Sequence, residues 1–101
     1  MAAFPLRVVY MTVPRTEESQ PPVSIMVSVP KKRFRHAIDR NRMKRLVREA
    51  FRLNKHILWT ALADKNVNMA VAFVCITDRL PDFHTVEKSM HKAMTRIAEK
   101  L

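Results

Sequence analysis

The chain has 101 residues, of which 48% are hydrophobic and 28% are charged, and this composition predicts one small soluble globular domain spanning residues 1–101. Its 19 Lys and Arg residues against 9 Asp and Glu residues give a net charge of +10, which predicts a polyanionic partner such as nucleic acid. The absence of glycine excludes P-loop and Rossmann phosphate sites, and the single cysteine excludes an internal disulfide. The sequence shows no apolar run long enough to span a membrane and no secretory signal pattern, so we expect a cytoplasmic protein.

The first two predicted elements are strands. Arg7–Val13 is rich in β-branched residues and contains a tyrosine, which favours a strand. Val23–Val29 places valine or isoleucine at every second position, the pattern of a strand with one apolar face. Pro14–Pro22 between them is polar and bounded by prolines, which is typical of a loop. We therefore expect this loop to join the two strands as an antiparallel pair.

A basic connector and a long helix follow. Pro30 ends the second strand, because proline cannot donate to a strand ladder. Lys31–His36 is either a flexible basic arm or an ordered loop, and Asp39 is placed to cap a helix from Arg40 to about Leu58. The apolar stripe of this helix is Met43, Leu46, Val47, Ala50, Phe51, Ile57 and Leu58, and the opposite side carries Asn41, Arg45, Arg48, Arg52 and Lys55.

The last third of the chain predicts a strand and a second helix. Met69–Thr77 is almost continuously apolar, as in a strand that is buried on both faces or in the middle strand of a sheet covered by helices. Thr85–Leu101 has helical periodicity, with Asp82 or Thr85 as its cap. The order strand, strand, helix, strand, helix predicts an α+β fold, a small mixed sheet with two helices packed on one face. The other face is then available for function.

Almost all of the net charge lies in one quarter of the chain. Between Lys31 and Lys55 there are eleven basic residues against two acidic ones, a net charge of +9. A solvated helix face would need more acids to pair with these bases, whereas a surface that binds phosphates would not. The start of the helix adds a positive dipole end to the arginines there. The predicted RNA-binding residues are Lys31, Lys32, Arg35, Arg40, Asn41, Arg42, Lys44, Arg45, Arg48 and Arg52.

The remaining polar residues do not predict catalysis. The four histidines have no metal-ligand spacing, and Asp39 and Glu49 lie among cations, a poor setting for a general base. We therefore predict no catalytic residue and no metal ligand in this chain. Tyr10 alternates with its neighbours so that it shares a strand face with Val8 and Thr12. If the helices leave that face open, its ring can stack on a base, and otherwise it packs in the core or at an edge.

The segment KKRFRHAIDRNRMKRLVREAFR, from Lys31 to Arg52, resembles the signature of the bacterial ribonuclease P protein subunit. That family carries a Lys-Lys pair after a strand, then Arg-Asn-Arg, a hydrophobic residue, Lys-Arg, two apolar residues and a further Arg. The strands around Tyr10, before the Lys pair and after the long helix resemble the family more weakly. The family's first helix, with two Phe residues, has no counterpart in this sequence. The connector lacks the family's usual glycine and carries one extra residue, which predicts a different path.

The resemblance implies both a fold and a role. The implied fold is like domain 2 of ribosomal protein S5, with a left-handed crossover between parallel strands around the basic helix. The implied role is the protein subunit of an endoribonuclease, which helps a catalytic RNA to remove the 5′ leader of precursor tRNA. The Arg-Asn-Arg helix would face the RNA subunit, and Tyr10 with Val8 would lie in a cleft that takes the leader. The chemistry would be done by the RNA with Mg²⁺ that the RNA mainly holds.

The implied partners are the catalytic RNA subunit and precursor tRNA, bound by one monomer in a 1:1 complex, with no membrane and no DNA. Two other classes of protein stay open. A general RNA- or ribosome-binding protein would use the same basic face without a role in tRNA processing. A basic amphipathic helix can also bind an acidic membrane or a calmodulin-like partner, although its apolar stripe here has a sheet to pack against.

Overall fold

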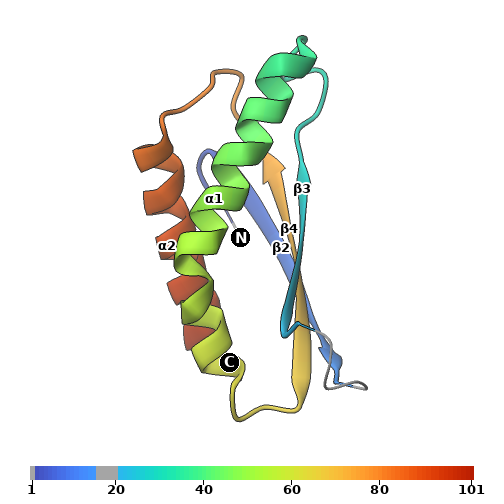
Figure 1. Ribbon diagram of the computed structural model, residues 1–101, viewed down its shortest axis with the longest axis vertical. Coiled ribbons are helices and arrows are strands. Elements are labelled where there is room, and N and C mark those ends of the chain that lie inside the picture. Colours follow the sequence, from blue (N-terminus) through green and yellow to red (C-terminus); the bar gives the residue numbers. More distant parts are fainter. Residues whose placement is uncertain (1, 16–20) are drawn as a thin grey trace.

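The computed structural model describes residues 2–15 and 21–101, which form four strands and two helices (Figure 1). The elements in chain order are β1 (Ala2–Ala3), β2 (Leu6–Pro14), β3 (Val23–Ser28), α1 (Ala37–Leu62), β4 (Val67–Cys75) and α2 (Phe83–Glu99). The strands form one sheet in the order β1-β2-β4-β3. The predicted α+β class is therefore confirmed. Of the predicted loop Pro14–Pro22, residues 16–20 lie outside the described residues.

The predicted antiparallel pairing of the first two long strands is wrong, because β4 lies between them. β2 is antiparallel to β4 from Leu6 opposite Cys75 to Pro14 opposite Val67. β3 is parallel to β4, with Val23 opposite Met69. The physical reason is that β4 is the most apolar strand, and the centre of the sheet gives it a neighbour on both sides. The short strand β1, which the sequence does not signal, extends the edge beside Leu6 and Arg7.

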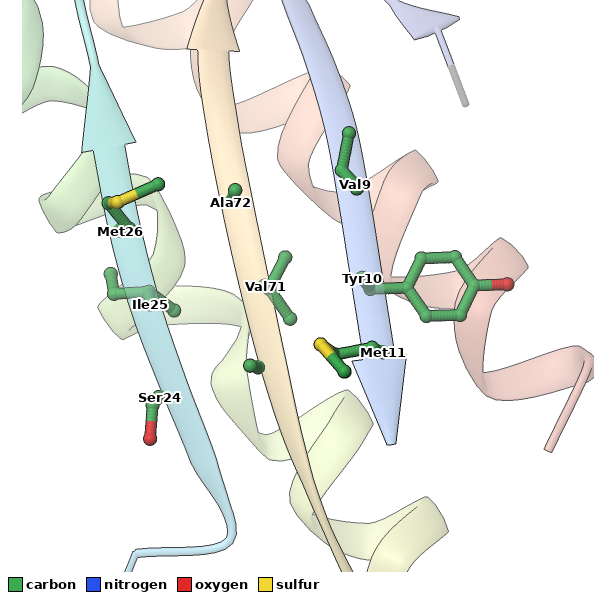
Figure 2. A pocket seen from close by; sticks show the side chains of 9 residues that line it. Val9, Tyr10, Met11, Ser24, Ile25, Met26, Val71 and Ala72 are labelled. Atoms are coloured by element: carbon green, nitrogen blue, oxygen red, sulfur yellow. The ribbon is translucent and has the colours of Figure 1, made fainter. Parts of the chain in front are cut away.

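The connection from β3 through α1 to β4 is left-handed. Figure 2 views the sheet from the face that the helices leave open, with β3 and β4 pointing upward and the helices behind them. β4 lies to the right of β3 in this view, and the connection between these parallel strands passes behind the sheet. A crossover with this geometry is left-handed. Nearly all such connections in proteins are right-handed. The predicted exception to that rule is confirmed.

Both helices pack on one face of the sheet and run in the same direction (Figure 1). The core lies between these two layers, and the face of β4 that carries Met69, Val71 and Phe73 is buried in it. The opposite face of β4 carries Ala70 and Ala72, which are exposed and half-buried. β4 is thus the middle strand of a sheet covered on one side, and it is not buried on both faces. Neither helix of the described chain is long and apolar enough to cross a membrane.

Helix α1 begins at Ala37, earlier than predicted, and Asp39 is not its cap. His36 is the residue before the helix, and its side chain makes no capping hydrogen bond. The start is fixed instead by Arg40, whose guanidinium donates to the carbonyl oxygens of Phe34 and Arg35 at 2.9 and 3.0 Å. Asp39 lies in the first turn, where a carboxylate interacts favourably with the positive end of the helix dipole. At the other end, α1 continues to Leu62, which is buried.

Helix α2 has the cap that the sequence predicts. The carboxylate of Asp82 accepts a hydrogen bond from the backbone N–H of Thr85 at 2.8 Å, which confirms Asp82 as the residue before the helix. Hydrogen bonding with the side chain of Thr85, and then with its backbone N–H, lowers the pKa of Asp82. A polar contact inside the helix layer was not predicted. Asn54 of α1 is buried, donates to the carbonyl of Ala50 and lies 3.1 Å from the Nδ1 atom of His91 of α2.

Candidate nucleic-acid interface

Asn41 and four of the basic side chains of α1 form one line along the helix. Members of this line are three or four residues apart, so neighbours lie within about 60° of each other on the helix surface. We call this line the α1 stripe, and it consists of Asn41, Arg45, Arg48, Arg52 and Lys55. Lys55 is half-buried and the other four are exposed, while the buried residues of α1 lie on the other side. At about 1.5 Å per residue, the stripe is about 21 Å long.

The basic connector before α1, Lys31–His36, is an ordered loop. This was one of the two predicted alternatives, the other being a flexible arm. The backbone N–H groups of Arg33 and Phe34 donate to the carbonyl of Pro30, which closes a turn. The Phe34 side chain is buried in the core, and Arg33 forms an ion pair with Asp78 at 3.1 Å. These contacts hold the connector beside the start of α1, and the side chains of Lys31, Lys32 and Arg35 on it are exposed. The connector and the stripe therefore present their cations on one continuous segment.

Three of the eleven basic residues between Lys31 and Lys55 already have partners within the protein. Arg33 pairs with Asp78, Arg40 binds backbone carbonyls, and Arg52 binds Glu49. Arg40 was predicted to bind RNA, and the structure places it as an anchor of the connector. Within the described chain, the other eight make no ion pair or side-chain hydrogen bond, and they are Lys31, Lys32, Arg35, Arg42, Lys44, Arg45, Arg48 and Lys55. These eight cations are available to an anionic ligand.

The pair of Arg52 and Glu49 lies on the exposed side of α1. Two hydrogen bonds from the Arg52 guanidinium lower the pKa of Glu49 and raise the pKa of Arg52. Glu49 therefore stays ionised at neutral pH and holds two of the N–H groups that Arg52 would offer to a phosphate. The stability of such an exposed pair is small, so a phosphate can compete for the guanidinium.

A shallow apolar groove occupies the face of the sheet that the helices leave open (Figure 2). Its floor is Ala70 and Ala72 of the central strand, and larger side chains rise on the neighbouring strands on both sides. Val9 and Met11 of β2 and Met26 of β3 are all exposed there. The sequence predicted that this face is open. It can accommodate apolar groups or the faces of bases, but it has no cation to hold a phosphate among the side chains that line it.

Val8 and Tyr10 lie on the covered face of β2, on the opposite side from Val9 and Met11. The Val8 side chain is only 1% exposed and is part of the core, so the prediction that it lines an open cleft does not fit the structure. Tyr10 is half-buried and packs against the core, which corresponds to the edge-packing alternative. Its ring projects beyond the edge of β2, away from β4, and remains partly accessible (Figure 2).

The described residues contain no group of three or more His, Cys, Asp or Glu side chains that is placed to hold a metal ion. Cys75 is buried beneath the sheet, and this burial raises the pKa of its thiol. A thiol whose pKa is raised by burial is a poor nucleophile.

Sequence reasoning missed one feature of this surface. Trp59 is four residues beyond Lys55 and continues the spacing of the α1 stripe, and its side chain is 41% exposed. The Nζ atom of Lys55 lies 4.8 Å from the centre of the Trp59 ring, a cation–π contact. The alternation of three- and four-residue steps that defines the stripe would have predicted this position, had it been followed past Lys55.

Comparison with known proteins places the chain in a family. The model of a family described as Ribonuclease P matches residues 3–98. Ribonuclease P protein components of two Porphyromonas gingivalis strains are each 52% identical to the chain over 95 residues, which cover 94% of the chain and 68% of each relative. A Chlorobaculum tepidum protein of the same name is 44% identical over 66 residues, covering 59% of the chain and 43% of that relative.

No solved structure matches the chain, so the likeness to domain 2 of ribosomal protein S5 stays a prediction. The family match, in contrast, spans nearly all the described elements, from the short strand β1 to the end of α2. It includes the connector and the α1 stripe, which carry most of the cations that make no ion pair within the described residues. The chain therefore belongs to the ribonuclease P protein component family.

Proposed function

We propose that this chain assists the catalytic RNA subunit of ribonuclease P in removing the 5′ leader of precursor tRNA. The observation that carries the proposal is the set of eight cations on the connector and α1 that make no ion pair or side-chain hydrogen bond within the described residues, in a chain of this family. Phosphates attract such cations, and arginine outnumbers lysine on the stripe, which suits bidentate contacts to phosphate oxygens. The stripe would face the RNA subunit in a 1:1 complex.

The second contact in the proposal is with the leader. A single-stranded leader has unpaired bases, which stack on aromatic rings and apolar surfaces. The apolar groove lies on the open face of β2, β4 and β3, and the partly accessible ring of Tyr10 projects past the edge of β2 from the covered face. This arrangement supports a leader path across the groove and around that edge. Cations would hold the RNA subunit on one layer, and an aromatic and apolar surface would hold the leader on the other.

The chemistry in this proposal belongs to the RNA. Hydrolysis of a phosphodiester is favoured by divalent metal ions that bind the attacking and leaving oxygens. The described side chains offer no carboxylate cluster for such an ion, and the phosphates of the RNA subunit would hold Mg²⁺ instead. The protein's part is then to neutralise phosphate repulsion and to position the precursor. We also propose that it acts in the cytoplasm, where tRNA is made in bacteria.

Binding titrations distinguish this role from that of a general RNA-binding protein. We expect tighter binding to ribonuclease P RNA than to a structured RNA of the same length at the same salt concentration. We also expect the complex with the RNA subunit to bind precursor tRNA more tightly than mature tRNA. Tyr10→Ala should reduce that preference for the precursor, and Tyr10→Phe, which keeps the ring, should retain it. Equal affinity for both structured RNAs, and no preference for a leader, would favour the general RNA-binding protein.

A further inference from the structure

The exposed line on α1 ends in an aromatic side chain. Asn41, Arg45, Arg48, Arg52 and Lys55 are followed at the next four-residue step by Trp59, which lies on the same side of the helix. From Asn41 to Trp59 the line is about 27 Å long at about 1.5 Å per residue. Trp59 is therefore at the far end of the cationic surface from the connector, on the side that faces solvent.

The surroundings of Trp59 differ from those of a core residue. Its side chain is 41% exposed, and the core cluster of the described residues does not include it. Lys55 covers the ring with its ammonium group at 4.8 Å from the ring centre. Exposing part of a large aromatic ring to water sacrifices hydrophobic stabilisation that burial would give. An aromatic ring interleaved with cations is the combination that single-stranded nucleic acid contacts use, since cations bind the backbone and rings stack on bases.

We propose that Trp59 stacks on an unpaired base of RNA bound along α1, and that Lys55 binds the adjacent phosphate. This role rests on one part of the proposed function, which is that RNA binds along α1. It adds a site for an unpaired nucleotide beyond the last arginine of the stripe. Duplex RNA keeps its bases stacked inside the helix, so this end of α1 selects a loop, a bulge or a single-stranded junction.

Trp59 is the only tryptophan in the chain, so the intrinsic fluorescence of the whole protein at tryptophan wavelengths reports this one ring. The probes are ribonuclease P RNA, a structured RNA of the same length with unpaired loops, and a fully paired RNA duplex. We expect the first two to quench the emission of Trp59 on binding, because an excited indole loses emission when it stacks on a base. The duplex should bind through the cations and leave the emission nearly unchanged.

Substitutions test the same contact through affinity. Trp59→Ala should weaken binding to the loop-containing RNAs by about 5- to 150-fold, the range expected for one lost base stack. Trp59→Phe should recover most of this loss. The matched control is Leu53→Ala on the same helix, since Leu53 is 43% exposed but lies about 120° around the helix from Trp59. Leu53→Ala should leave the affinity unchanged.

The dependence of affinity on salt separates stacking from phosphate binding. Stacking releases no counterion, so Trp59→Ala should keep the slope of log affinity against log salt, whereas Lys55→Ala should make it shallower by about one. Thermal midpoints equal to that of the unmodified chain confirm that each variant is folded. Stacking is overturned if both loop-containing RNAs bind without quenching, or if Trp59→Ala and Leu53→Ala bind equally well. Quenching by both of these RNAs with equal affinity would instead support the stacking site and contradict the ribonuclease P role.

Discussion

Phe51→Ala should come close to unfolding the protein. Phe51 is buried on the inner side of α1, and its ring centre lies 6.2 Å from that of Phe73 on the central strand. Removing a buried phenylalanine ring leaves a cavity and costs about 3–5 kcal/mol, against a total stability of about 5–15 kcal/mol for a domain of this size. The thermal midpoint should fall by on the order of 15–30 °C, measured by circular dichroism.

The matched control for this substitution is Arg48→Ala, three residues away on the outer side of the same helix. Arg48 is exposed and has no ion pair within the described residues, so its removal should change stability by no more than about 0.5 kcal/mol. It should weaken binding to the RNA subunit, because a phosphate contact is lost. If Arg48→Ala melts early and Phe51→Ala does not, the orientation of α1 is wrong and so is the assignment of its outer side to RNA.

RNA affinity should fall by about 10²–10⁴-fold between 50 and 200 mM salt. Each neutralised phosphate releases about 0.7–0.9 counterions, so contacts to about 5–8 phosphates give a log–log slope of about −4 to −7. Eight cations on the connector and α1 make no ion pair or side-chain hydrogen bond among the described residues, which is enough for this number of contacts. The affinity for ribonuclease P RNA, measured at four or more salt concentrations, gives the slope directly.

The double substitution Arg45→Ala with Arg48→Ala should make this slope shallower by about two, because it removes two phosphate contacts. The comparison variant is Arg7→Ala, since Arg7 is exposed on β2, away from the connector and α1. It should leave the slope unchanged. A slope for the unmodified chain shallower than about −2 would mean that the segment from Lys31 to Lys55 is not the contact surface.

The fold could be predicted from the sequence wherever local patterns decide the structure. The alternation in Val23–Val29 and the helical spacing around Phe51 each reflect one element burying one face, so both elements were predicted correctly. The pairing of β2 with β4 was not predicted, because it joins residues more than 50 positions apart and depends on which strand gains most from the centre of the sheet. The start of α1 was missed because the Arg40 guanidinium, binding carbonyls of the preceding turn, takes the place of a capping side chain.

The sequence predicted where along the chain the candidate site lies. It did not predict which of the basic side chains already bind a partner within the protein. The sequence shows that Arg33, Arg40 and Arg52 are basic, but it does not show that each already has a partner. Whether Tyr10 faces the helices depends on the register of β2 against the rest of the sheet. That register is set by the burial of Leu6 and Val8. Both faces of this strand carry apolar residues, so its sequence alone does not show whether Leu6 and Val8 or Val9 and Met11 are the buried ones.

The most direct test of the central claim is cleavage of precursor tRNA at low Mg²⁺ concentration, where we expect the RNA subunit alone to be slow because its phosphates repel the substrate. Adding the unmodified chain to bacterial ribonuclease P RNA should restore cleavage at the mature 5′ end. The Arg45→Ala, Arg48→Ala double variant should need a higher protein concentration for the same rate, and the protein without the RNA subunit should cleave nothing. An RNA subunit whose rate is unaffected by the protein, or specific cleavage by the protein alone, would contradict the account.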